Sequence, residues 1–220
     1  MIKVKYTWST PEAENLIVKM ARVSAPKNAG NFETAPRLLR YLINHKHWSP
    51  FEMANLCLEI HCPRSISQQI IRHRSFSFQE FSQRYANTNE IGRPEVPHLR
   101  AQDNKNRQNS LNDLEQRLGG DLVADFYRRI QTHFENGEHL YQEMVSAGVA
   151  KECARSVLPL NTTTKLFMNG TIRSWIHYLD LRTDPSTQLE HREVALKCLA
   201  LFDIHFPTIA EALWKTSESK

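Results

Sequence analysis

The segment around which this chain is organised reads Arg72-His73-Arg74-Ser75-Phe76-Ser77-Phe78-Gln79-Glu80-Phe81-Ser82-Gln83-Arg84-Tyr85. Charged groups and hydroxyls alternate there with aromatic rings, and a solvated run of charges would not expose so much apolar surface. Neither a helical nor a strand period separates the polar from the apolar residues, which argues against a plain core helix. Arginine forks and serine hydroxyls suit phosphate oxygens. The segment therefore indicates a pocket for a planar, phosphorylated ligand, although a basic strip with aromatic residues also suits single-stranded nucleic acid.

Length and composition favour one domain over residues 1–220, because 220 residues with 40% hydrophobic content can bury one substantial core. The sequence contains neither G-x-G-x-x-G nor G-x-x-x-x-G-K-[ST], so a Rossmann turn or a P-loop would not hold a nucleotide cofactor. A net charge of +4 leans mildly towards anionic ligands. No apolar run approaches the ~20 residues of a membrane span, and the N-terminus lacks a signal-peptide core. We expect a cytoplasmic protein without a membrane partner.

The cysteines and histidines give weaker signals. The four cysteines form no C-x-x-C motif, and buried structural thiols are favoured over a disulfide framework or a catalytic thiol. His45 and His47 could be read as a metal pair, but neither cysteine nor carboxylate companions stand at ligand spacing. We therefore predict no metal site.

Hydrophobic periodicity predicts helices and strands without a regular alternation. Alternating residues predict half-buried strands at 2–8 and 56–62, and β-branched content favours a third at 162–168. Helical periodicity predicts helices at about 10–25, 38–45, 65–73, 111–118, 121–147, 152–157, 171–183, 189–202 and 209–214. Residues 86–109 are polar and read as an exposed excursion. The mixture predicts an α+β fold with a mainly antiparallel sheet flanked by helices, and no Rossmann fold.

Local signals refine this prediction. Thr10 before Pro11 predicts a helix N-cap, and Ser49-Pro50-Phe51-Glu52 has the form of a capping box. The helix N-terminus predicted at Ser49 could offer free N–H groups to an anion, or serve as a cap alone. Gln69 shares a helical face with Arg72 and His73 and so joins the candidate site by spacing. The residues after Arg74 are expected to form a loop that carries Ser77, Glu80, Ser82 and Arg84, and Gly137 marks a point where the long helix could break.

The spacing Arg72-His73-Arg74-x2-Ser77-x4-Ser82-x-Arg84 resembles the signature of the flavin-dependent thymidylate synthases. Further motifs follow in the family's order: Ala21-Arg22-Val23-Ser24, His47-x-Ser49-Pro50-Phe51-Glu52, Arg155 through Pro159, and Arg173-x3-His177-x4-Arg182. The resemblance covers most of the chain outside roughly 93–120. It implies reductive methylation of dUMP to dTMP, with 5,10-methylenetetrahydrofolate as carbon donor, FAD as hydride carrier and NADPH as reductant. It also implies a homotetramer whose active sites are shared between subunits.

The resemblance also assigns residues to ligands. It implies FAD binding by Ser24, Ser49, Arg72, His73, Arg74, Glu80, Thr171, Arg173 and His177. It implies dUMP binding by Gln69, Arg72, Glu80, Phe81, Ser82, Gln83, Arg84, Arg155 and Arg182. Thr171 stands where some members have asparagine, and His177 matches one branch of the family. Taken singly, residues such as Arg155 or Arg173 could be surface charges, and the joint pattern is what favours a site.

The chemistry implied for Arg182 follows from the substrate. Carbon 5 of uracil becomes nucleophilic when the ring gains electron density, and a permanent cation beside the ring favours that form. Ser82 is interpreted as a hydrogen-bond partner of dUMP because no base that would activate it is evident. The competing hypothesis is a nucleic-acid-binding protein, which predicts binding that weakens steeply with salt and no flavin colour. The resemblance favours the enzyme, with no nucleic-acid partner.

Overall fold

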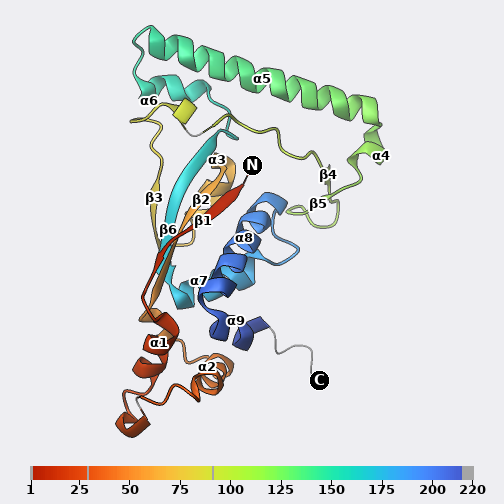
Figure 1. Ribbon diagram of the computed structural model, residues 1–220. Helices are drawn as coiled ribbons and strands as arrows, with labels where there is room; N and C mark the ends of the chain where they lie inside the picture. Colours follow the sequence, from red (N-terminus) through yellow and green to blue (C-terminus); the bar gives the residue numbers. More distant parts are fainter. Residues whose placement is uncertain (1, 29, 91, 215–220) are drawn as a thin grey trace.

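The computed structural model describes residues 2–28, 30–90 and 92–214. Its main sheet has antiparallel pairings in the order β1-β2-β6-β3, formed by β1 (Lys3–Ser9), β2 (Asn55–Pro63), β6 (Thr163–Thr171) and β3 (Phe76–Glu80). Helices lie along one face of the sheet and beyond both of its ends (Figure 1). This arrangement confirms the predicted α+β class with a mainly antiparallel sheet flanked by helices.

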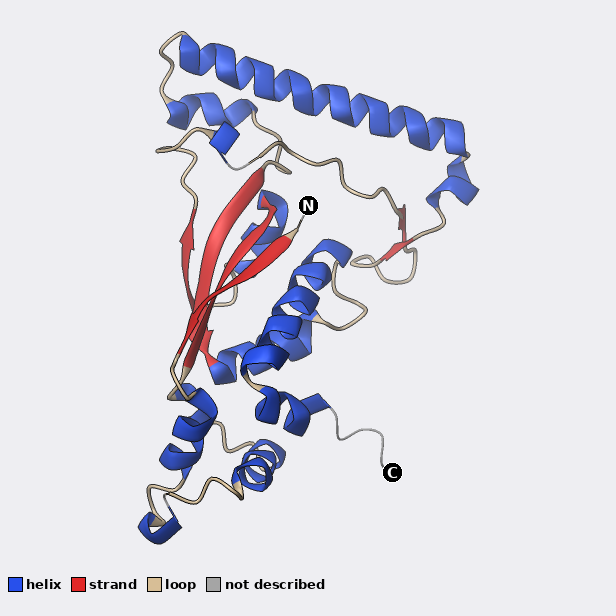
Figure 2. Cartoon of the chain, viewed as in Figure 1, coloured by secondary structure: helices blue, strands red, loops and turns tan. Residues whose placement is uncertain are grey.

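The core lies between the two central strands and two C-terminal helices. Alternate residues of β2 are fully buried, and Leu58 and Ile60 stand opposite Met168 and Leu166 of β6. The helices α7 (Ile172–Arg182) and α8 (Leu189–His205) cover this face side by side (Figure 2). The period of two along the strands thus places one apolar stripe under the helices.

The helix α7 begins where β6 ends. Thr171 closes the strand, and its side-chain oxygen accepts a hydrogen bond from Ser174 N at 3.2 Å, which caps the helix. Trp175 is buried on the inner face and its Nε1 donates to Leu56 O at 2.9 Å. The predicted apolar face of α7 is confirmed, because Ile172, Ile176 and Leu179 are buried as well.

The remaining segments are peripheral to the sheet. They are α1 (Ala13–Ala21), η1 (Pro26–Asn28), α2 (Ala35–Asn44), η2 (Ser49–Glu52), α3 (Arg64–Ile70), η3 (Thr88–Glu90), β4 (Ala101–Gln102), β5 (Ser110–Leu111), α4 (Leu114–Leu118), α5 (Gly120–Ser146), α6 (Lys151–Ala154), η4 (Arg155–Val157) and α9 (Pro207–Trp214). The long helix α5 crosses the end of the molecule above the sheet (Figure 1). Among the described helices, none is both long enough and apolar enough to cross a membrane.

Several local predictions are wrong for identifiable reasons. The segment after Arg74 is not a loop throughout, because residues 76–80 pair with β6 as the edge strand β3. Thr10 does not cap α1; its Oγ1 accepts from Asn55 N at 2.9 Å and joins the chain to β2. Ser49 starts a short 3-10 helix without a side-chain cap, so the capping box does not form. In each case a long-range pairing or a tight turn overrides the local signal.

Other differences concern the edges of elements. β1 carries a register shift between Tyr6 and Trp8, which breaks the predicted alternation and leaves both rings about two-fifths exposed, at 40% and 44%. The helix predicted from residue 111 begins at Leu114, after β5. Helix α5 runs unbroken through Gly137.

The segment at 86–109 is only partly the exposed excursion that was predicted. Thr88 and Ala101 are buried, and the short strand β4 pairs with β5. Ile91 of this segment lies outside the described residues. The excursion is therefore anchored to the fold at both of these buried points.

Gly170 tests the packing of the sheet. It stands opposite Phe76 in the β3–β6 pair, and an added Cβ would lie 2.4 Å from Phe76 Cδ1. We predict that Gly170→Ala lowers the free energy of unfolding by about 1–3 kcal/mol, because the buried ring must move. The matched control is Gly120→Ala, where no atom lies within 4 Å of the new Cβ. Urea denaturation at fixed protein concentration measures both, and equal stability of Gly170→Ala and wild type would contradict the packing described here.

Candidate functional site

The signature segment is divided by the edge strand. Arg72, His73 and Arg74 precede β3, whereas Ser82 and Arg84 follow it. A strand rises by roughly 3.3 Å per residue, so the five residues of β3 separate the two groups by roughly 16 Å. We call Gln69, His73 and Arg182, which lie near α7, the α7 group. We call Glu80, Ser82 and Arg84, which lie near α6, the α6 group.

The α7 group centres on an arginine–histidine contact. Arg182 Nε, in the last turn of α7, donates to His73 Nε2 at 3.0 Å. The His73 ring lies edge-on to Tyr178, with ring centroids 4.9 Å apart at an angle of 85°. Gln69 Oε1 lies 3.4 Å from His191 Nδ1, and His191 belongs to the buried face of α8. The structure thus brings together the predicted residues Gln69, His73 and Arg182.

The electrostatics of this group leave one permanent charge. Burial, and then the charge of Arg182, lower the pKa of His73 to about 4. Burial, Arg182 and His73 lower the pKa of His191 to about 3, while burial raises the pKa of Tyr178 well above its ordinary value. Both imidazoles and the phenol are therefore neutral near pH 7. The Arg182 guanidinium is the cation that a ligand would meet there.

A second set of predicted residues surrounds the start of α7. Arg173 forms an ion pair with Glu52, on the turn η2 that begins at Ser49. The His177 ring lies against Trp48, with centroids 4.9 Å apart, beside a cavity of about 380 Å³. These contacts place the predicted residues from α7 and η2 next to one another.

The two signature arginines that precede β3 are available to a ligand. The side chains of Arg72 and Arg74 are exposed, and neither has a hydrogen-bond or ion-pair partner among the described residues. Ser24 is also exposed, in the turn after α1 that buried Arg22 organises by donating to Asn28 O at 3.1 Å. Thr171 differs, because its side chain is used to cap α7.

The α6 group is held by other partners. Glu80 Oε1 accepts from Ser67 Oγ at 2.7 Å and from Thr164 Oγ1 at 3.0 Å, and Arg64 lies 3.6 Å away. Arg84 pairs with Glu152 of α6 at 3.1 Å. These contacts join the end of β3 to α3, β6 and α6.

The other predicted dUMP residues of this end differ in exposure. Ser82 is exposed and borders a cavity of about 360 Å³ together with Phe81. Gln83 is buried, and Arg155 is half-buried on η4, directly after α6. A ligand at this end can therefore reach the side chains of Ser82 and Arg84 most directly.

The cysteines do not supply an activated thiol in the α7 group. Burial raises the pKa of Cys57 and raises that of Cys62 to about 12, and it raises the pKa of Cys198 as well. Cys153 is exposed, so the prediction of buried thiols is wrong for that residue alone among the cysteines. Within the described residues, no three His, Cys, Asp or Glu side chains gather as a metal site requires.

Sequence reasoning missed several polar residues that support the site. They are Arg100, Tyr178, Gln188, Glu190 and His191. His191 carried a usable signal, since it falls in register with the buried residues Val194, Ala195 and Cys198 of α8. A polar side chain on the buried face of a helix needs a hydrogen-bond partner. That need could have marked His191 for attention.

Comparison with known proteins identifies the family. Residues 4–208 match the family model described as "Thymidylate synthase complementing protein". The chain is 48% identical over 201 residues to a flavin-dependent thymidylate synthase from Synechocystis sp., covering 91% of this chain and 89% of the relative. The chain belongs to the flavin-dependent thymidylate synthase family.

Other members of the family and a related structure agree with this assignment. A probable flavin-dependent thymidylate synthase from Paramecium bursaria Chlorella virus 1 is 48% identical over 201 residues, covering 91% of this chain and 90% of that protein. The crystal structure of a UMP/dUMP methylase from Streptomyces cacaoi, bound with 5-Br dUMP, has a TM-score of 0.80 at 28% identity. The match covers 96% of this chain and 94% of the methylase.

The neutral His73 predicts a pH dependence of stability. The pKa is about 4 in the folded chain and 6.5 in the reference state, so the unfolded chain binds more protons between these values. Stability should fall as the pH drops from about 6.5 to about 4, and His191 acts in the same direction. In His73→Gln an amide oxygen can accept from Arg182 without titrating, and the fall should be shallower. The urea midpoint of unfolding, measured from about pH 4 to about pH 6.5, gives the pH dependence of stability for each protein. The same pH dependence in the variant and in the wild type would contradict a neutral His73 in the folded chain.

Proposed function

We propose that the protein methylates dUMP to dTMP, with 5,10-methylenetetrahydrofolate as carbon donor, FAD as hydride carrier and NADPH as reductant. The observation that carries the proposal is the α7 group, where the permanent cation of Arg182 lies beside the neutral His73 in a chain of this family. Relatives are named flavin-dependent thymidylate synthases, and a structural neighbour is a methylase bound with 5-Br dUMP. The protein is proposed to act in the cytoplasm.

The residues present fit a flavin dinucleotide. Arg72 and Arg74 offer exposed guanidinium groups without partners among the described residues, which suits a pyrophosphate. Ser24 and Ser49 add exposed hydroxyls, and His177 presents an exposed ring beside a cavity. When bound, FAD would supply hydride transfer between NADPH and the one-carbon unit. The chain's own residues would orient it through these cations, hydroxyls and rings.

Arg182 is proposed to stabilise negative charge on the uracil ring. Its Nε is occupied by His73, which fixes the plane of the guanidinium and leaves the two terminal nitrogens for a ligand. Because His73 is neutral, it holds Arg182 without offsetting the charge. A fixed cation in a partly buried site acts on developing negative charge more strongly than it would in water. The high pKa of the buried Cys62 argues against a thiolate that adds to the pyrimidine.

We further propose a homotetramer with shared active sites. The α7 group and the α6 group lie on opposite ends of β3, so one nucleotide cannot meet both groups of the same chain. Helix α5 supports association, because it exposes Leu122 and Leu140 at 43% and 45%, and only Val123 and Tyr141 of its described residues are buried. A neighbouring chain would bring its α6 group to the α7 group and cover these side chains.

Arg182→Ala tests the activation role. We expect the rate of dTMP formation with saturating dUMP to fall by about 10²–10³, because a preorganised cation is removed from developing charge. Arg182→Lys should also be impaired, since lysine keeps the charge but loses the planar fork. Both variants should still allow NADPH to reduce the flavin, which is measured as a loss of flavin absorbance. If Arg182→Ala instead formed dTMP at the wild-type rate, Arg182 would have no role in activation.

Mixing inactive variants tests the shared site. We expect Arg84→Ala and Arg182→Ala to be inactive alone and to regain up to about a quarter of wild-type activity after co-refolding, because random assembly leaves that share of sites with both arginines intact. The control mixture is His73→Ala with Arg182→Ala. These residues belong to one group of one chain, so no mixed site is complete and activity should stay lost. Recovery in the control mixture, or none in the test mixture, would contradict the division of the site.

A further inference from the structure

A chain of hydrogen bonds runs behind Gln69, from the core of the protein to the excursion at 86–109. Its members, in order, are Tyr178, His191, Gln69, Gln188, Glu190 and Arg100, which we call the amide relay. Tyr178 Oη lies 3.2 Å from His191 Nε2, and His191 Nδ1 lies 3.4 Å from Gln69 Oε1. Gln69 Nε2 and Gln188 Oε1 are 2.7 Å apart. Five segments of the fold, including two helices of the core, contribute to this one line of contacts.

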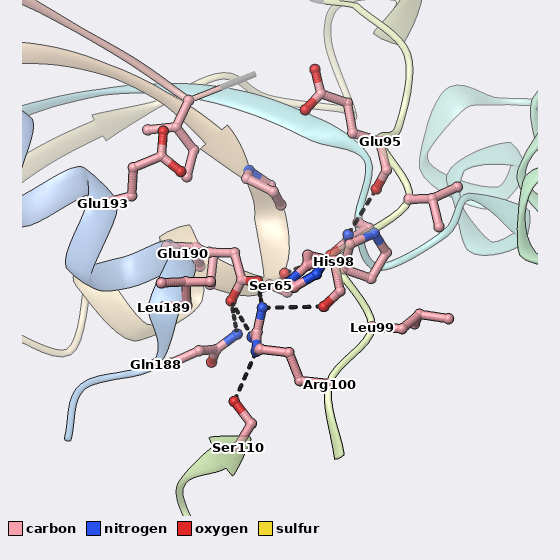
Figure 3. A pocket seen from close by; sticks show the side chains of 16 residues that line it. Ser65, Glu95, His98, Leu99, Arg100, Ser110, Gln188, Leu189, Glu190 and Glu193 are labelled. Carbon is pink, nitrogen blue, oxygen red and sulfur yellow. Dashed lines mark hydrogen bonds and ion pairs between the residues drawn. The ribbon is translucent and has the colours of Figure 1, made fainter. Parts of the chain in front are cut away.

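The outer end of the relay is an ion pair. Arg100 donates from Nη1 to Glu190 Oε1 at 2.7 Å and from Nη2 to Oε2 at 3.1 Å, and its Nε donates to Ser110 Oγ at 2.8 Å. Gln188 Nε2 donates to the same carboxylate at 2.9 Å. Figure 3 shows Gln188 and Arg100 converging on Glu190 beside Ser110. The two charged side chains are largely buried, at 11% and 17% exposure, so the pair is a fixed anchor.

The Arg100–Glu190 pair determines which atom donates in each hydrogen bond from Gln188 to Tyr178. Burial raises the pKa of Glu190, but the hydrogen bonds from Arg100 and Gln188 outweigh it and hold the pKa below its ordinary value. A carboxylate only accepts, so Gln188 must turn its amino group to Glu190 and its oxygen to Gln69. Gln69 must then turn its own amino group to Gln188 and its oxygen to His191. The neutral His191 ring must carry its proton on Nδ1 and accept from Tyr178 at Nε2.

We propose that His191 is a positioning residue that fixes the side-chain amide of Gln69 with its oxygen inward and its amino group towards the nucleotide. This inference rests on the proposed function, which places dUMP at Gln69. One N–H of the Gln69 amino group goes to Gln188, and the second is left to donate. The partner of that N–H on the ligand is an acceptor oxygen, either a carbonyl of the uracil ring or a phosphate oxygen. Without His191, the Gln69 oxygen loses its partner and the side chain is held only through Gln188, so the second N–H is no longer fixed towards the ligand.

Two substitutions distinguish the ring nitrogens of His191. The amide nitrogen of His191→Asn falls near the position of Nδ1 and can still donate to Gln69, whereas the longer His191→Gln places its amide near Nε2. We expect the Kd of dUMP on the FAD-loaded full chain to rise by about threefold to tenfold for His191→Leu and His191→Gln, as for the loss of one oriented hydrogen bond. His191→Asn should stay near wild type. Isothermal titration calorimetry measures all three.

A double-mutant cycle separates positioning from general destabilisation. In a Gln69→Ala background, His191→Leu should cause no further loss of dUMP affinity, because the amide it orients is gone. Additive losses would overturn the proposal. The matched control is Lys197→Met, on the same helix, which removes a hydrogen bond to Ile2 O without touching the relay and should leave the Kd of dUMP unchanged. Loss of dUMP affinity in this control would also overturn it.

Deoxyuridine serves as the second ligand and locates the acceptor. A loss of affinity for both deoxyuridine and dUMP in His191→Leu places the acceptor on the uracil ring, and a loss for dUMP alone places it on the phosphate. Unchanged affinity for both ligands would overturn the proposal.

The tautomer of His191 gives a readout that does not depend on activity or on folding of the variants. Nitrogen-15 spectra of the wild-type protein should show a protonated Nδ1 and an unprotonated Nε2 between pH 6 and 8. The opposite tautomer would overturn the direction of the relay. If the wild-type protein bound no dUMP, the proposed function would fail, while this spectrum would still decide whether the relay exists.

Discussion

The pairing of β3 with β6 is the constraint on which the rest of the site depends. β3 pairs with β6 along its full length, and Phe76 packs so closely over Gly170 that a Cβ added there would displace the ring. The residues before and after this strand are therefore held at its opposite ends. In the proposed homotetramer another chain would complete the α7 group, and the exposed apolar residues of α5 would lie in the contact between chains. The position of β3 is therefore the structural basis of the proposed shared site.

Within the α7 group, the neutral side chains and the charged side chain have different roles. His73, half-buried, and His191, buried, are neutral because desolvation and the charge of Arg182 lower their pKa values, so the guanidinium keeps its full effect on a ligand. The neutral rings then serve as hydrogen-bond partners with fixed geometry. His73 orients Arg182 and His191 orients Gln69, and the Arg100–Glu190 pair anchors the far end of the same network. The charge and the orientation of the site therefore come from different residues that support one another.

The sequence predicted the fold class, the three longest strands and the apolar face of α7, because these depend on periods that run over many residues. It could not predict β3, whose strand structure comes from pairing with β6, distant in sequence. The spacing of Gln69, Arg72 and His73 predicted one helical face, yet α3 ends at Ile70. Gln69 instead contacts His191, whose ring lies 6.2 Å from that of His73. His191 and Arg100 were missed because their partners belong to other elements. Elements with a long hydrophobic period could be predicted from the sequence, whereas contacts between distant elements could not.

The claim that one nucleotide is held by two chains is tested most directly by dUMP binding as a function of assembly. The FAD-loaded protein would be diluted through the dissociation of its oligomer, with mass followed by analytical ultracentrifugation and dUMP binding by the change in flavin absorbance. The account predicts that dUMP binding disappears together with the oligomer. In a monomer the α7 group would lack the α6 group of a second chain, and so no complete site would remain. A monomer that binds dUMP with the affinity of the oligomer would contradict it.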